Sequence, residues 1–205
     1  MSIETGTEAM LTRRREILAQ GAEPLGWKVG FNVPEVQQKL GIDAPLAGFL
    51  TTDSLIEDEW DEYPVVVESE VAVEIGDDGR SIAALLPALE LADPPDLDLE
   101  TEQILAGNIF HRAVAFGPRV ETAEPGAARI VVNGEEMHSI DAERTGANLE
   151  AMVEAVAARL EAAGEELRAG ERIITGVLAP PHEAKEGDTV RLELEALGSV
   201  ELRFS

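Results

Sequence analysis

Two glutamates inside a strongly apolar stretch are the most informative residues of this 205-residue sequence. Residues 64–75 alternate with the two-residue period of a β-strand, so Glu68 and Glu70 lie on one face with Cα atoms about 6–7 Å apart. The valines around them are β-branched, as in a buried strand. Two ionised carboxylates there repel each other unless one is protonated or a cation lies between them. The pair therefore predicts a site for an oxygen-ligated ion such as Mg²⁺ or Mn²⁺, with Ca²⁺ as an alternative. The competing interpretation is an edge strand whose glutamates face water.

A third carboxylate, Glu90, interrupts another apolar stretch, residues 85–92. Three oxygen ligands would form an open carboxylate site, in which a metal can polarise a substrate carbonyl group. A capping or salt-bridged glutamate is the alternative interpretation of Glu90.

Composition excludes several classes of function. An apolar fraction of 44% and a mean hydropathy of −0.05 favour a soluble globular chain, expected to form one domain over residues 1–205. The formal charge of −25 makes nucleic acids and anionic membranes poor partners. The absence of cysteine excludes disulfides and thiolate nucleophiles. Without a membrane-length apolar run or a signal sequence, a cytoplasmic location is expected.

Periodicity and turn residues predict the elements that must position the glutamates. Helices are expected at residues 4–20 (within an N-terminal helical segment, 1–21), 34–40 and 149–163. Strands are expected at residues 27–31, 64–75, 128–132, 135–138, 173–178, 189–194 and 200–204. The strands expected at residues 128–132 and 135–138 flank Asn133-Gly134, a strong hairpin signal.

Two segments give weaker signals. Residues 81–91 are interpreted as a helix leading into a strand, and residues 104–116 are ambiguous. Because strands outnumber helices and the connections vary, an α+β or largely β architecture is favoured over a doubly wound sheet.

Four segments, in order, carry a resemblance to a known family. They read GWKVGFNVPEVQQKLGIDAP (26–45), VESEVAVEI (67–75), LLPALELAD (85–93) and LRAGERIITGVLAP with the following strands (167–204). Together they resemble the 2-keto-4-pentenoate hydratase and 2-oxo-3-hexenedioate decarboxylase branch of the fumarylacetoacetate hydrolase superfamily. The resemblance covers about half of the chain. It implies a mixed β-sandwich roll with flanking helices, and a homo-oligomer.

The resemblance also implies roles for individual residues. It assigns Glu68, Glu70 and Glu90 as metal ligands and Lys28 as the active-site lysine. As a cation in an apolar strand, Lys28 could stabilise an enolate oxygen, or donate a proton if burial and the metal lower its pKa; the alternative is a surface lysine. Two further sets of residues match substrate-binding segments: Thr175 with Gly176, and Asn108.

The departures from the family pattern concern acid–base chemistry. Leu46 stands where the family has an acidic residue, and residues 107–110 retain only Asn108 of a conserved segment. The segment between Glu70 and Glu90 is also shorter than the family pattern.

His111 and Arg112, which follow that segment, are candidates to compensate. His111 could serve as an acid or base near neutral pH, and Arg112 could bind a substrate carboxylate. A hydrogen-bonded loop histidine is the alternative. No role is assigned to His138 or His182.

The resulting expectation is a metal-dependent lyase for a small 2-oxo acid or 2-hydroxydienoate, with hydratase preferred. Three alternatives stay open: a 2-oxo acid decarboxylase, an acylpyruvate C–C hydrolase, and a degenerate protein that binds a metal and a 2-oxo acid without turnover.

Overall fold

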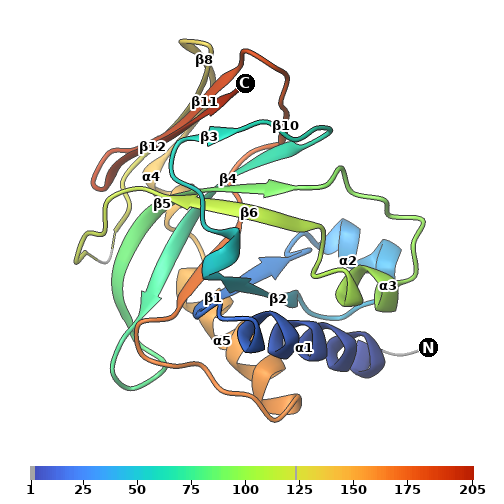
Figure 1. The fold of residues 1–205 in the computed structure, drawn as a ribbon. Helices are drawn as coiled ribbons and strands as arrows, with labels where there is room; N and C mark the ends of the chain where they lie inside the picture. The colour runs from blue at the N-terminus through green and yellow to red at the C-terminus, as the bar shows by residue number, and fades with distance from the viewer. Residues whose placement is uncertain (1–2, 123) are drawn as a thin grey trace.

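The computed structural model describes residues 3–122 and 124–205, and two β-sheets form its centre (Figure 1). In the first sheet the strand order is β2-β1-β9-β4-β5-β6, and β10 also pairs with β4. Its strands are β1 (Pro24–Gly30), β2 (Leu46–Thr51), β4 (Val66–Ile75), β5 (Ile82–Ala92), β6 (His111–Phe116), β9 (Arg172–Val177) and β10 (His182–Glu183).

The second sheet, at the top of Figure 1, has the order β3-β12-β11-β7-β8. Its strands are β3 (Glu59–Trp60), β7 (Ala128–Val132), β8 (Glu135–Ile140), β11 (Thr189–Leu194) and β12 (Gly198–Phe204). The predicted hairpin is confirmed: β7 and β8 are antiparallel, and Asn133 and Gly134 both have positive φ, as a tight hairpin turn requires.

The helices lie mainly at the opposite end of the molecule, where α1 and α5 flank β1 and β2 (Figure 1). They are α1 (Ile3–Ala19), α2 (Pro34–Leu40), α3 (Thr101–Ala106), α4 (Ala142–Thr145) and α5 (Leu149–Ala162), with a 3₁₀ turn, η1, at Thr52–Ser54. The predicted α+β class, a mixed β-sandwich with flanking helices, is confirmed. None of the described helices is long and apolar enough to cross a membrane.

A buried apolar cluster joins the two sheets and the helices. It contains Val71 and Val73 of β4, Leu192 of β11 and Phe204 of β12, together with Val153 of α5. Burial of this apolar surface is the main force that holds the sheets together. Because β4 lies between β9 and β5, both of its edges are hydrogen-bonded.

Two sequence expectations need correction. Residues 82–92 form a single strand, β5, so the predicted helical lead-in is wrong: pairing with β4 and β6 overrides the helix propensity of its alanines and leucines. The edge-strand alternative for residues 64–75 is also wrong, because β4 is an interior strand. The ambiguous segment 104–116 divides into the end of α3 and the whole of β6, and β2 and β3 had no sequence prediction.

Candidate metal centre

Glu68, Glu70 and Glu90 come together at the β4–β5 ladder. Glu68 is directly opposite Glu90, and Glu70 lies on the same face two residues further along β4. One carboxylate oxygen from each residue lies within 4.8 Å of the others. This spacing allows all three side chains to bind one cation.

Burial makes it costly for all three carboxyl groups of this cluster to be ionised at once. Glu70 and Glu90 are 0% exposed. Burial, together with the charge of Glu90, raises the pKa of Glu68 to about 7. Burial and the charges of Glu90 and Glu68 raise the pKa of Glu70 well above its ordinary value, against the opposing effects of Lys28 and the Gly176 N–H.

Two oxygens of the cluster have no partner that would offset their burial. Glu70 Oε1 and Glu90 Oε2 are buried and have no hydrogen-bond partner within residues 3–122 and 124–205. A buried carboxylate oxygen without a partner is costly, and a divalent cation with oxygen ligands would satisfy both.

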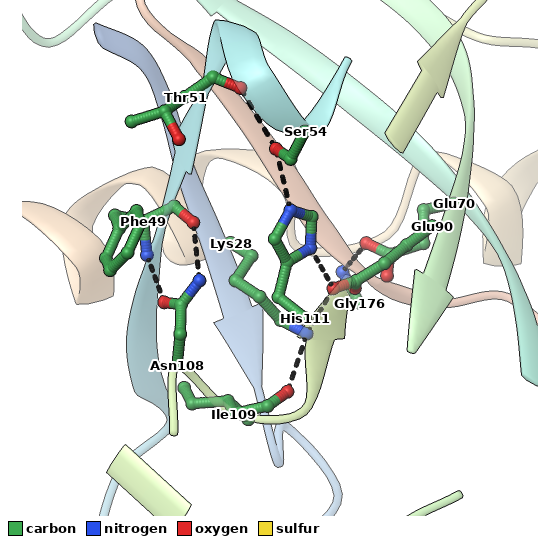
Figure 2. Close-up of polar contacts among 10 residues, drawn as sticks. All are labelled: Lys28, Phe49, Thr51, Ser54, Glu70, Glu90, Asn108, Ile109, His111 and Gly176. Atoms are coloured by element: carbon green, nitrogen blue, oxygen red, sulfur yellow. Dashed lines mark hydrogen bonds and ion pairs between the residues drawn. The ribbon is translucent and has the colours of Figure 1, made fainter. Parts of the chain in front are cut away.

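Lys28 reaches the cluster from β1 (Figure 2). Its Nζ forms an ion pair with Glu90 Oε1 and donates a hydrogen bond of 3.1 Å to the Ile109 carbonyl. Burial would lower the pKa of Lys28, but the charges of Glu90, Glu68 and Glu70 outweigh burial and raise it. Among the protein groups alone, the surrounding carboxylates therefore favour the charged form of Lys28 next to the cluster.

His111 contacts the same oxygen of Glu90 as Lys28 does (Figure 2). Its Nδ1 lies 2.8 Å from Glu90 Oε1, and its Nε2 lies 3.0 Å from Ser54 Oγ. Burial alone would raise the pKa of Glu90, but Lys28 and His111 outweigh it and lower the pKa. Glu90 is thus held ionised while Glu68 and Glu70 are pushed toward protonation.

Of the predicted pair Thr175 and Gly176, only Gly176 contacts the carboxylates. The Gly176 N–H donates a 2.6 Å hydrogen bond to Glu70 Oε2, with φ at 100°, a conformation that favours glycine. A Cβ at this position would lie 2.5 Å from Asn32 Nδ2. The Thr175 hydroxyl instead donates to the Val71 carbonyl at 2.8 Å, so Thr175 ties β9 to β4.

Asn108 supports the site without lining it. Its Oδ1 accepts a hydrogen bond of 2.8 Å from the Phe49 N–H, and its Nδ2 donates one of 2.9 Å to the Phe49 carbonyl (Figure 2). Asn108, Ile109 and Phe110 all have positive φ, a backbone conformation that is uncommon for residues other than glycine. The Asn108 contacts with β2 hold this strained turn in place, and the turn carries the Ile109 carbonyl that receives Lys28.

A cavity of about 190 Å³ opens at the cluster. Lys28, Glu68 and Gly176 lie at its polar part, while its other lining is mostly apolar. Its apolar side chains include Phe31, Val33, Val36, Leu97, Phe110 and Val177. A cavity of this kind suits a small molecule with one polar end.

Arg112 and Leu46 are not among the residues that line this cavity. Arg112 donates to the Pro64 carbonyl at 3.2 Å, forms an ion pair with Glu62 and stacks its guanidinium over Trp60. Its Nε also lies 3.7 Å from Asp93, which lines the cavity, so the contact of Arg112 with a substrate stays a prediction. Leu46 is buried in an apolar cluster with Ile104. Sequence reasoning missed Ser54, whose only signal was its place in a polar turn.

Comparison with known proteins places the chain in a family. The profile described as "Fumarylacetoacetate (FAA) hydrolase C-terminal" matches residues 47–205, and the chain belongs to this family. Among curated relatives, "2-keto-4-pentenoate hydratase 1" from Dechloromonas aromatica (strain RCB) is 29% identical over 93% of this chain and 81% of its own length. "2-keto-4-pentenoate hydratase" from Paraburkholderia xenovorans (strain LB400) is 27% identical over 96% and 81%.

Solved structures agree on the fold. "4-oxalocrotonate decarboxylase from Pseudomonas putida G7", complexed with magnesium and adipate, matches with a TM-score of 0.88 at 20% identity, over 100% of this chain and 87% of its own. Fumarylpyruvate hydrolase from Pseudomonas aeruginosa, in complex with Mn²⁺ and pyruvate, matches with a TM-score of 0.63 at 16% identity, over 87% and 88%. The fold expected from the sequence resemblance is therefore confirmed.

Proposed function

We propose that this protein is a divalent-metal-dependent lyase for a small 2-oxo acid or 2-hydroxydienoate, with hydration of a 2-keto-4-pentenoate-type substrate as the reaction. The observation that carries this proposal is the convergence of Glu68, Glu70 and Glu90 with Lys28 at one end of a small apolar cavity. The names of the curated relatives support the same reaction.

Glu68, Glu70 and Glu90 would hold the ion, with Mg²⁺ or Mn²⁺ as the first candidates and Ca²⁺ as an alternative. When bound, such an ion acts as a Lewis acid toward the carboxylate and 2-oxo oxygens of the substrate. The Gly176 N–H keeps Glu70 oriented, because it occupies Oε2 and leaves Oε1 without a protein partner among the described residues.

Lys28 would stabilise the enolate oxygen of the substrate. Its ammonium group has three N–H donors, and the described residues provide two acceptors, Glu90 Oε1 and the Ile109 carbonyl. One donor remains for a substrate oxygen. Because its pKa is raised among the protein groups, Lys28 is available as a cation rather than as a base.

The cavity lining favours a monocarboxylate over a dicarboxylate. Lys28 is the only basic side chain among its described lining residues; of the two acidic ones, Glu68 belongs to the cluster and Asp93 is paired with Arg112 at 3.7 Å. A second carboxylate at the far end of the substrate would find apolar side chains such as Val33 and Leu97 rather than a cation. This favours hydratase over decarboxylation of a dicarboxylate such as 2-oxo-3-hexenedioate.

Leu46 motivates one other candidate, a protein that binds a metal and a 2-oxo acid without turnover. An acid at that position would be expected to take part in proton transfer, and a buried leucine cannot. C–C bond hydrolysis has no corresponding support among the described residues of the cavity.

The proposal is tested by incubating the purified protein and Mn²⁺ or Mg²⁺ with 2-hydroxypenta-2,4-dienoate, and following loss of the conjugated absorbance. The expected result is metal-dependent loss that Glu70→Gln abolishes, with a dicarboxylate analogue consumed more slowly. Ion binding by calorimetry without turnover of any 2-oxo acid would instead support the binding protein, and absence of ion binding would refute both.

The oligomeric state and the cellular location of the protein are also proposals. The family resemblance supports a homo-oligomer, which light scattering of the purified protein would measure, and the sequence supports a cytoplasmic location. A monomer at all tested concentrations would contradict the first.

A further inference from the structure

The two oxygens of Glu90 have different surroundings. Oε1 receives Lys28 Nζ and lies 2.8 Å from His111 Nδ1. Oε2 is buried and has no hydrogen-bond partner among the described residues. The carboxylate is therefore held from one side only, with its free oxygen available for an ion.

A bulge in the β5–β6 ladder brings His111 to this carboxylate. Glu90 pairs with Val114 and Leu91 with Ala113, but Ala92 pairs with His111 rather than with Arg112. Residues that pair across a ladder share a face, so the shift places His111 on the Glu90 face. In a regular ladder Arg112 would take that place.

Ser54 fixes the other end of the imidazole ring. Its hydroxyl has a single proton, which it donates to the Thr51 carbonyl at 2.9 Å. Ser54 Oγ also lies 3.0 Å from His111 Nε2, a hydrogen-bond contact that holds the ring at this end. At the other end of the ring, the Nδ1 contact of 2.8 Å holds Glu90 Oε1.

We propose that His111, anchored by Ser54, is a positioning residue that fixes the rotation of Glu90 and so presents Oε2 to the divalent cation. This inference rests on the proposed function, because it assumes that Glu90 is a metal ligand. The imidazole side chain is only 3% exposed and does not belong to the cavity lining. This location favours a positioning role over the acid–base role expected from the sequence.

Lys28 alone does not provide the same constraint. Its ammonium group rotates on a four-carbon chain, whereas a planar ring bonded at both nitrogens has one orientation. Groups that orient metal ligands in this way typically change metal affinity by about 10–100-fold when they are removed.

The test compares Mn²⁺ affinity, by calorimetry and electron paramagnetic resonance, in His111→Leu, His111→Asn and Ser54→Ala. His111→Leu should weaken binding about 10–100-fold. His111→Asn, whose amide nitrogen can replace Nδ1, should recover most of the loss. Ser54→Ala keeps the ring but loses its anchor, so it should weaken binding less than His111→Leu and broaden the Mn²⁺ signal. His138→Leu, on β8 of the second sheet, is the matched control.

Wild-type affinity in a folded His111→Leu protein would overturn the inference while leaving the metal site intact. An equal loss in His111→Asn and His111→Leu would also overturn it, because a hydrogen bond would then not be the cause. If His111→Leu fails to fold, Ser54→Ala decides: unchanged affinity and line shape refute the positioning role. Failure of the wild-type protein itself to bind Mn²⁺ would refute the proposed metal site as well.

Discussion

Glu68 and Glu90 occupy directly opposite positions in the antiparallel β4–β5 ladder. Residues paired in this way have Cβ atoms about 4.5–5.5 Å apart, and like charges at such a pair destabilise a sheet. Both strands are interior, so water cannot fully screen the repulsion. The sheet thus pairs two like charges whose repulsion a divalent cation would relieve.

Glu70→Gln should weaken Mn²⁺ binding and stabilise the ion-free protein. Loss of one ligand charge is expected to weaken affinity by roughly two orders of magnitude. At the same time it removes a buried carboxylate whose pKa is raised by burial and by Glu90 and Glu68. Calorimetry and thermal unfolding with chelator measure the two effects. Glu74→Gln is the control, since Glu74 is on the same strand but is paired with Arg119; equal losses of affinity in both variants would contradict the assignment.

Lys28→Met should abolish turnover while Mn²⁺ still binds within about tenfold of the wild-type affinity, because the three carboxylates remain. The physical reason is that Lys28 contributes a positive charge at the substrate oxygen and is not itself a metal ligand. Steady-state assays and calorimetry separate the two. Lys39→Met, at an exposed position of α2, should leave both unchanged. Normal turnover in Lys28→Met would remove this residue from the mechanism.

The ion-free protein should lose stability as pH rises through the pKa of Glu68. That pKa is about 7 in the folded protein, above its ordinary value of 4.5. A raised pKa means that the folded state favours the protonated group, so its stabilisation is complete below about pH 4.5 and is lost as pH rises through 7.

Glu68→Gln isolates this effect from the 41 acidic residues of the chain. In chelator, the melting temperature of the wild-type protein should fall relative to that of Glu68→Gln between about pH 5 and 8, by roughly 2–4 °C per kcal/mol. Mn²⁺ should oppose the fall, because the ligands bind it when deprotonated. Parallel pH profiles of the two proteins would show that Glu68 does not titrate in this range.

Asn108→Ala should destabilise the protein by about 2–4 kcal/mol, since it leaves the N–H and carbonyl of Phe49 without their side-chain partner. Urea unfolding measures this loss. Asn148→Ala is a matched control: Asn148 also has positive φ, but its side chain makes no capping hydrogen bond. It should cost about 1 kcal/mol from backbone strain alone. Equal costs would mean that backbone strain, and not the bonds to Phe49, explains the role of Asn108.

The glutamate cluster was largely predictable from the sequence because its signal is local. Alternation places Glu68 and Glu70 on one face of a strand, and the apolar neighbours of Glu90 indicate that it too is buried. Lys28, in an apolar strand, was conspicuous for the same reason. The hairpin at Asn133-Gly134 depends only on the turn residues.

The tertiary structure decided everything that depends on pairing between distant segments. Residues 82–92 became one strand because β4 and β6 supply hydrogen bonds on both sides. The bulge that exchanges Arg112 for His111 on the Glu90 face leaves no mark in either strand's sequence. Ser54 is 57 residues from His111 along the chain, and only the fold brings the two together. The sequence by itself determined which residue types form the charged cluster; pairing, register and burial determined which atoms meet and which remain free for an ion.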